Sequence, residues 1–236
     1  MFQGKTELLL DMNSTFMFGE DRFGEDEDFA IFYQTLGGSL AAADVNRLIS
    51  DAYAYLDQRY PKLEYRERFP TLAQALTAVS PTALPDHELQ RLIATFAHHE
   101  CGEIPLAYRQ ALKQLAHSFT LALVIDIWAP KQKWLELFQR YGILHLFSVM
   151  SFSSDHGHVK PSSAPFELVV SELVASKSQC LVIGDSARRD LGGALAANLD
   201  CVLVGKETDK AALAHYPSLL ELTNDLLASR CQTVQP

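Results

Sequence analysis

Short apolar runs alternate with amphipathic segments along much of the chain. Four runs are typical of buried strands in a parallel sheet, and three of them are rich in Val or Ile. They cover residues 7–11, 121–126, 180–185 and 201–205, with a weaker candidate at 144–152. Apolar residues at helical spacing predict helices over 130–142, 165–177 and 187–198. This alternation of strand and helix predicts an α/β protein with a Rossmann-like, doubly wound parallel sheet.

Residues 21–108 do not follow that alternation. Their apolar positions recur every three or four residues, with prolines between the segments, which predicts helices and no strand. The expected helical segments are 26–38, 39–60, 71–79 and 86–99. We therefore expect an α/β core built from residues 1–20 and 109–236, and an all-helical cap domain of residues 21–108 inserted after the first strand. The last residues, 231–236, are expected to form a loose tail.

Composition and charge exclude several classes of function. The net charge is −9 and basic runs are short, which argues against nucleic-acid binding through phosphate neutralisation. No apolar run approaches the roughly 20 residues of a membrane helix, and the N-terminus has no signal-peptide pattern. The four cysteines have no metal-site spacing, so reduced thiols and a cytoplasmic location are expected. The sequence leaves the oligomeric state open.

Acidic residues close three of the predicted strands: Asp11, Asp126 and Asp185. Ligands of parallel α/β sheets bind at the carboxyl ends of the strands. Any one of these aspartates alone could be a helix cap, but three together indicate a site. Asp190 can turn back toward the same place, and Lys160 is the obvious cation to balance the acids. Hard oxygen ligands around a lysine suggest Mg²⁺ and a phosphate-bearing substrate.

This pattern resembles the haloacid dehalogenase (HAD) superfamily, whose members are mostly Mg²⁺-dependent phosphatases. The family's first motif, D-x-D-x-T, corresponds to residues 11–15, Asp-Met-Asn-Ser-Thr. Its second, a Ser or Thr at a strand end, corresponds to Asp126, and its third, a lysine often followed by proline, to Lys160. Its fourth, G-D-S-x-x-x-D, is matched in full by residues 184–190. The helical insert resembles the family's cap.

The resemblance implies a role for each matched residue. Asp11 would be the nucleophile that forms an aspartyl-phosphate. Mg²⁺ would be held by Asp11, by the backbone carbonyl of Asn13 and by Asp185, with Asp190 as a further ligand or support. Lys160 would pair with the phosphate and orient Asp11. Asp126, Ile127 and Lys160 would bind the substrate, which the resemblance implies to be a small phosphorylated metabolite.

Two departures from the family pattern fall at the catalytic positions. The family's second aspartate protonates the leaving alkoxide, and Asn13 has no titratable proton to give; losing such a group typically costs about 10²–10⁴ in rate. Asp126 places a negative charge where a neutral hydroxyl would meet the phosphate. Three interpretations follow: a weak or specialised phosphatase, a phosphatase in which Asp126 has become the acid/base, or a catalytically inactive binding or regulatory protein. A dehalogenase is disfavoured, because those enzymes need no Mg²⁺ and lack the G-D-S form of the fourth motif.

Other polar clusters have simpler interpretations. Four potential metal ligands at 98–101 are adjacent on one helix and would point in different directions, so a helix end is expected. His156 and His158 fit a solvated loop near the site entrance. Trp128 is expected to pack in the core or beneath the cap. The basic residues of the 59–69 segment are expected on a solvated helix face, although a cap cation over the pocket would help to select an anion: Arg59, Lys62, Arg66 and Arg68.

Overall fold

The computed structural model of the chain describes residues 2–231, in which six parallel strands form one sheet. The strand order β3-β2-β1-β4-β5-β6 places the first strand in the centre, and every neighbouring pair is parallel. The prediction of a doubly wound α/β fold is confirmed. The strands are β1 (Glu7–Leu10), β2 (Thr120–Ile125), β3 (Phe147–Phe152), β4 (Cys180–Gly184), β5 (Asp200–Val204) and β6 (Ala214–Tyr216).

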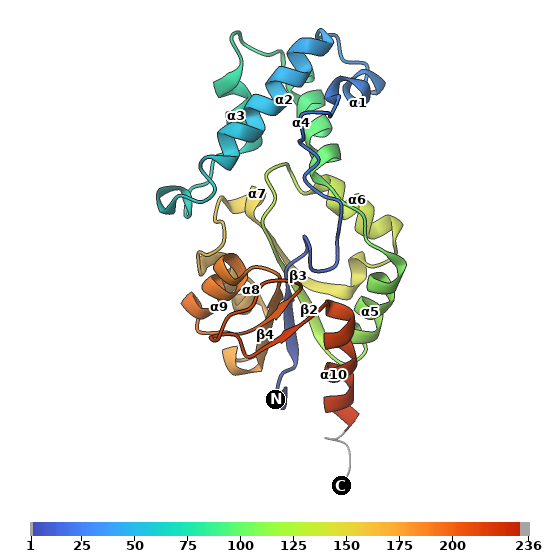
Figure 1. Cartoon of the computed structure of the whole chain (residues 1–236), viewed down its shortest axis with the longest axis vertical. Helices are drawn as coiled ribbons and strands as arrows, with labels where there is room; N and C mark the ends of the chain where they lie inside the picture. Colours follow the sequence, from blue (N-terminus) through green and yellow to red (C-terminus); the bar gives the residue numbers. More distant parts are fainter. Residues whose placement is uncertain (1, 232–236) are drawn as a thin grey trace.

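The central strand shows why this sequence forms a buried sheet. Leu8, Leu9 and Leu10 are fully buried, and alternate side chains enter different apolar layers. Leu8 and Leu10 pack with α5, α6 and α10, whereas Leu9 packs with α8 and α9 (Figure 1). These helices are α5 (Leu106–Ala116), α6 (Gln132–Arg140), α8 (Ala164–Glu172), α9 (Gly192–Ala196) and α10 (Leu219–Cys231).

Some elements are shorter than the periodicity predicts. The strand expected at 144–152 begins as a single 3₁₀ turn, Leu144–Leu146, before β3. The helix expected over 165–177 ends at Glu172, and the one expected over 187–198 consists of a π-helical turn, Ala187–Leu191, followed by α9. The short edge strand β6 was not predicted, because its three residues carry no apolar run. Of the expected loose tail, residues 232–236 lie outside the described residues.

Helices α1–α4 lie beyond the carboxyl ends of the strands (Figure 1). They are α1 (Phe29–Thr35), α2 (Ala42–Asp57), α3 (Leu72–Val79) and α4 (Asp86–Glu100), and α2 packs against the other three. Two of them begin with a side-chain cap: Asp28 caps α1, and Thr71 forms a capping box with Gln74 at α3. The division into a core and a cap domain stays a prediction, and α5 crosses its expected boundary at residue 108.

Two short connections link α1–α4 to the sheet, and they run side by side. The amide of Arg22 donates to the carbonyl of His99, and the amide of Phe18 donates to the carbonyl of Glu103. Between α2 and α3, residues 60–69 form a loop with a 3₁₀ turn, Leu63–Tyr65. Among residues 2–231, no helix combines the length and the apolar composition that crossing a lipid bilayer requires.

Candidate active site

Sheet register brings Asp11 and Asp185 together. Leu10 pairs with Ile183 in the adjacent strand, and the amide of Asp11 donates to the carbonyl of Ile183 at 2.8 Å. The two strands therefore end side by side, each followed by an aspartate. Carboxylate oxygens of Asp11, Asp185 and Asp190 all lie within 4.8 Å of one another. Three of the four aspartates singled out in the sequence thus form one cluster.

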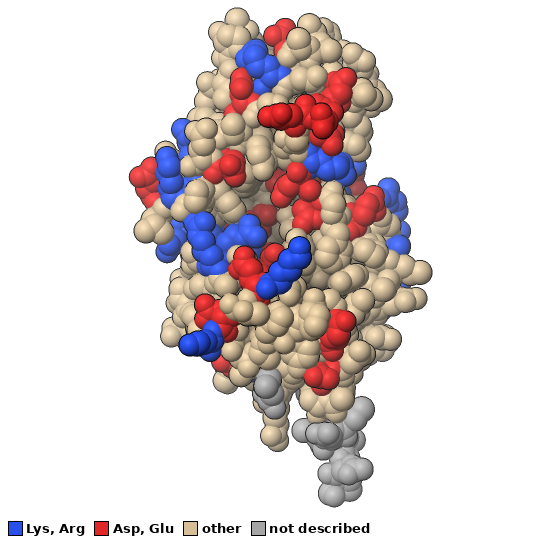
Figure 2. Space-filling view, in the orientation of Figure 1, with Lys and Arg blue, Asp and Glu red and all other residues tan. Residues whose placement is uncertain are grey.

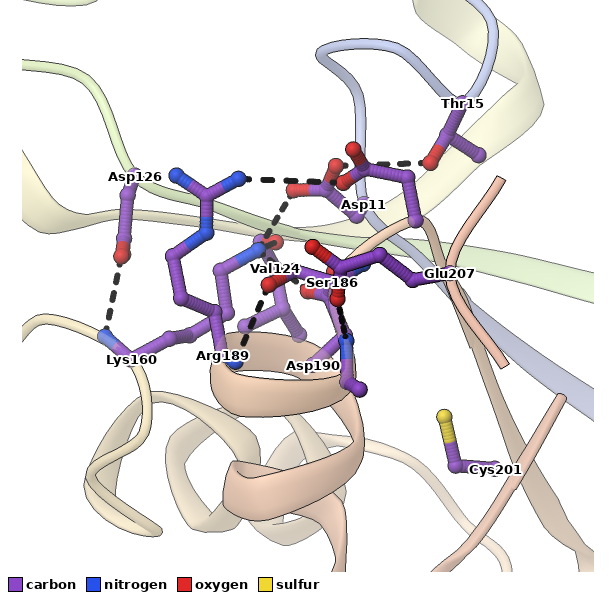
Figure 3. A network of polar contacts seen from close by, with 12 residues as sticks. Asp11, Thr15, Val124, Asp126, Lys160, Ser186, Arg189, Asp190, Cys201 and Glu207 are labelled. Atoms are coloured by element: carbon purple, nitrogen blue, oxygen red, sulfur yellow. Dashed lines mark hydrogen bonds and ion pairs between the residues drawn. The ribbon is translucent and has the colours of Figure 1, made fainter. Parts of the chain in front are cut away.

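The ammonium group of Lys160 contacts two of these three acids (Figure 3). Its Nζ lies 2.5 Å from Oδ1 of Asp11, 2.7 Å from Oδ1 of Asp190 and 3.2 Å from the carbonyl oxygen of Val124. The lysine side chain is only 3% exposed. An ammonium group has three N–H donors, so all three are engaged by the protein itself. The nearby carboxylates raise the pKa of Lys160 despite its burial, and it remains a cation.

The GDSARRD stretch fixes Asp190 by local geometry. Ser186 caps the π-helical turn, and its backbone amide donates to Oδ2 of Asp190 at 3.0 Å. Gly184 is required here, because a Cβ atom on it would lie 2.2 Å from Cγ of Asp190. Both oxygens of Asp190 accept hydrogen bonds, one from Ser186 and one from Lys160. The geometry suits a residue that holds the lysine in place.

The donor set fits a divalent cation bound by oxygen ligands. Oδ1 of Asp185 is buried and has no hydrogen-bond partner among the described residues, and Oδ2 of Asp11 has only a long contact of 3.4 Å with the Thr15 hydroxyl. A buried carboxylate oxygen without a donor is costly unless a cation satisfies it. Mg²⁺ is typically held in proteins by one or two carboxylates together with waters. Asp11 and Asp185 are therefore the residues that would hold it.

Burial and mutual repulsion raise the pKa values of two acids in the cluster. Burial raises the pKa of Asp11 to about 7, with Lys160 opposing the shift and Asp190 adding to it. Burial, together with the charge of Asp190, raises the pKa of Asp185 to about 6. Such shifts are expected where several carboxylates share one cation. An additional positive charge, such as a bound cation, would favour the ionised form of both groups.

Asp126 lies beside this cluster and has different partners. Its Oδ2 accepts hydrogen bonds from the Tyr60 hydroxyl at 2.6 Å and from the backbone amide of Lys160 at 2.9 Å. Its Oδ1 is buried without a partner among the described residues, and burial raises the pKa of this carboxyl group. Sequence reasoning missed Tyr60, because it weighed only the basic residues of the 59–69 segment.

The remaining predicted site residues, Asn13 and Ile127, have clear positions. Asn13 follows β1 by three residues, and its amide oxygen is buried without a partner among residues 2–231. The amide of Ile127 donates to the Ser153 hydroxyl at 3.0 Å, and that hydroxyl donates back to the Ile127 carbonyl at 2.8 Å. Ser153 therefore holds the backbone of Ile127 in place, and the amide of this residue, which was expected to bind the substrate, is already engaged.

A cavity of about 550 Å³ opens beside Asp185 and Thr15. Its lining also includes Phe18, Tyr108 and Lys206, so apolar, aromatic and cationic groups all face it. Figure 2 shows charged side chains of both signs around a hollow between α1–α4 and the sheet. The volume is in the range of small-molecule sites.

The other clusters of the sequence do not join the carboxylates. Glu100, at the end of α4, accepts hydrogen bonds from the backbone amides of Trp128 and Ala129 at 2.6 and 2.9 Å. His98 stacks on Phe32, with ring centroids 3.9 Å apart. The guanidinium of Arg59 stacks on the ring of Tyr55, and Trp128 packs on Tyr60 and Phe69. The two histidines before Lys160 also have partners: His156 contacts the Ser151 hydroxyl, and His158 contacts the Glu67 carboxylate.

Part of the chain matches a known protein family. Residues 158–227 match a protein-family model described as HAD-hydrolase-like. This match supports the resemblance of the chain to the haloacid dehalogenase superfamily for residues 158–227. No curated protein matches this sequence.

Solved structures extend the likeness to the whole chain. A 2-haloacid dehalogenase from Pseudomonas syringae has a TM-score of 0.66 at 19% identity, covering 96% of this chain and 99% of its own. A HAD phosphatase from Thermococcus onnurineus has a TM-score of 0.62 at 16% identity, with coverages of 94% and 97%. YfnB from Bacillus subtilis, in a magnesium-bound crystal structure, has a TM-score of 0.59 at 19% identity, with coverages of 94% and 98%. At these identities the likeness establishes the shared HAD fold.

Proposed function

We propose that this HAD-superfamily protein is a Mg²⁺-dependent phosphatase of small phosphorylated metabolites. The observation that supports the proposal is the Asp11–Asp185–Asp190 cluster bound by Lys160 at the ends of β1 and β4. Asp11 would attack phosphorus and release the alcohol, and water would then hydrolyse the aspartyl-phosphate. Lys160 would keep the Asp11 carboxylate oriented. Bound Mg²⁺ would supply positive charge against the phosphoryl oxygens.

The leaving alkoxide needs a proton that Asn13 does not have. We propose that Asp126 supplies it, since its Oδ1 has no hydrogen-bond partner among the described residues and burial raises the pKa of its carboxyl group. A raised pKa favours the protonated form that this step needs. Asp126→Asn would keep the shape and remove the proton. Turnover that survives this substitution would show that Asp126 is not the acid.

A second candidate, a non-catalytic binding or regulatory protein, rests on the same residue. At this position the family resemblance expects a neutral hydroxyl that would face the phosphate, and Asp126 has a carboxylate instead. The Tyr60 hydroxyl and the Lys160 backbone amide both donate hydrogen bonds to that carboxylate. A permanently ionised Asp126 would repel a phosphate dianion by about 8 kcal/mol at 4 Å in an effective dielectric near 20, twice the repulsion between two unit charges. On this alternative the fold would serve as a binding module.

We also propose where in the cell the protein acts and what helices α1–α4 do. We place the protein in the cytoplasm, because its cysteines show no extracellular disulfide pattern. We assign helices α1–α4 to a cap that would select the substrate at the carboxyl ends of the strands. The cavity beside Asp185 supports a small ligand next to the acids, although its lining residues lie outside α1–α4.

The deciding experiment is phosphate release from p-nitrophenyl phosphate and from a panel of sugar and nucleotide phosphates, with and without Mg²⁺. Asp11→Asn serves as the matched control, because it removes the nucleophile with little change of shape. Mg²⁺-dependent turnover that disappears in this variant is the expected result. Equal phosphate release by both proteins would reject the phosphatase and favour the binding protein.

A further inference from the structure

The candidate active site has no spare donor on its lysine. All three N–H groups of Lys160 are engaged by Asp11, Asp190 and the Val124 carbonyl. A substrate phosphoryl group bound directly by Lys160 would have to displace one of these bonds. The Ile127 amide is engaged by Ser153, and Asp126 offers the anion a donor only in its protonated form. Another group must bind the anion.

Arg189 is a cation that lies over the acids themselves and is free to do so. Its guanidinium reaches over the cluster between Asp126 and Asp11 (Figure 3), with one nitrogen 3.8 Å from Oδ1 of Asp185. Among residues 2–231, this guanidinium makes no hydrogen bond, although it has five N–H donors. Its side chain is 39% exposed, so a ligand can reach it. A planar fork of donors suits phosphate oxygens.

The charges around Arg189 explain why the site needs it. Its charge lowers the pKa of Asp126, Asp185 and Tyr60 against the larger effect of burial, so it lies within electrostatic reach of all three. The ring of Tyr60 lies 5.9 Å from its guanidinium carbon, which limits the space it can occupy. Asp126 adds a carboxylate that the family pattern does not have, and Arg189 adds the compensating cation within the same site.

We infer that Arg189, in the fourth motif, binds the phosphoryl anion of the substrate in place of the second-motif hydroxyl that Asp126 has replaced. The inference rests on the proposed function, and it assigns the substrate anion to a residue outside the family's matched positions. Arg189 leaves the ion pair with Asp185 and donates to phosphoryl oxygens when the anion enters.

The neighbouring Arg188 provides a matched control. It stands on the same π-helical turn, but it is exposed and its guanidinium donates to the Pro61 carbonyl at 2.7 Å. Arg188→Gln and Arg189→Gln therefore remove the same charge from adjacent positions. Arg189→Lys keeps the charge and removes the planar fork. Thermal melting verifies that each variant is folded.

The test is calorimetric titration of inorganic phosphate into each protein at saturating Mg²⁺. We expect Arg189→Gln to weaken phosphate binding by about 10- to 100-fold, Arg189→Lys to give an intermediate loss and Arg188→Gln to match the unmodified protein. Mg²⁺ binding in the absence of phosphate should persist in all of them. Unchanged phosphate affinity in Arg189→Gln would overturn the inference.

Turnover of p-nitrophenyl phosphate in the same samples separates this inference from the proposed function. Phosphate binding that depends on Arg189 without turnover would reject the phosphatase and retain the anion site. Turnover with a KM unaffected by Arg189→Gln would retain the phosphatase and reject the anion site. A wild-type protein that neither binds phosphate nor hydrolyses the ester would reject both.

Discussion

The hydroxyl of Tyr60 donates a hydrogen bond of 2.6 Å to Oδ2 of Asp126. The backbone amide of Lys160 donates to the same oxygen at 2.9 Å. One carboxylate oxygen therefore joins the loop after α2, the end of β2 and the loop that carries Lys160. Nearby backbone bonds reinforce this junction: Phe69 donates to Gly157 at 2.7 Å, and Val159 donates to Arg66 at 2.9 Å.

Tyr60→Phe should loosen this junction. Loss of a hydrogen bond to a partly buried carboxylate is expected to lower the free energy of unfolding by about 1–3 kcal/mol. It should also make cleavage of residues 60–69 by proteases faster, because the loop loses its contact with Asp126. Urea unfolding and limited proteolysis measure the two effects. Tyr65→Phe is the control, since the Tyr65 hydroxyl has no hydrogen-bond partner among the described residues; an equal effect of both substitutions would contradict the role of Tyr60.

Asn13→Asp should raise phosphatase turnover. The substitution restores the carboxyl group that the family resemblance assigns as general acid and base, and such groups typically contribute about 10²–10⁴ in rate. Steady-state kinetics with p-nitrophenyl phosphate measures the gain, which should disappear when Asp11→Asn is added. No gain in a folded variant would mean that the acid is supplied from elsewhere, and Asp126→Asn then becomes the informative variant.

Mg²⁺ should stabilise the protein more at pH 8 than at pH 5.5. The pKa values of Asp11 and Asp185 are raised to about 7 and about 6, so both acids are mainly protonated at the lower pH and must lose protons to bind the metal. The increase in melting temperature on adding Mg²⁺ measures this binding. Asp185→Asn should remove most of the increase, whereas Asp155→Asn, which changes an exposed acid paired with Lys131, should preserve it. An equal Mg²⁺ effect at both pH values would contradict binding by these two acids.

Glu100→Gln should flatten the dependence of stability on pH. Burial raises the pKa of Glu100 to about 8, although the amides of Trp128 and Ala129 oppose the shift. A carboxyl group with a raised folded-state pKa contributes its full stability below the unfolded value near 4.5, and that contribution is lost as pH rises through about 8. Urea unfolding between pH 5 and pH 8.5 should therefore show a smaller decline for Glu100→Gln. The exposed Glu136→Gln should leave the decline unchanged, and an identical decline in Glu100→Gln would contradict the assignment.

The sheet could be predicted because its strands are short, buried on both faces and locally apolar. The leucines before Asp11 and the Val- and Ile-containing runs that precede Asp126 and Asp185 each identify a strand without reference to the rest of the chain. Parallel strands align their carboxyl ends, so the meeting of Asp11 and Asp185 followed from the same pattern. Strand β6 and the π-helical turn at Ala187–Leu191 were missed, since their pairing and hydrogen bonding depend on neighbours far away in sequence.

Amino-acid order alone was enough to recognise the α/β sheet, the helical segment after the first strand, and the candidate acids with their lysine. These depend on periodicity and on motifs of a few residues. Tertiary structure alone decided which side chains complete the site. Tyr60 reaches Asp126 across 66 residues of sequence, and the guanidinium of Arg189 lies over the acids. Helical periodicity identifies a buried face but does not specify which residue of a distant loop it will meet, because that contact is set by how α1–α4 pack above the sheet.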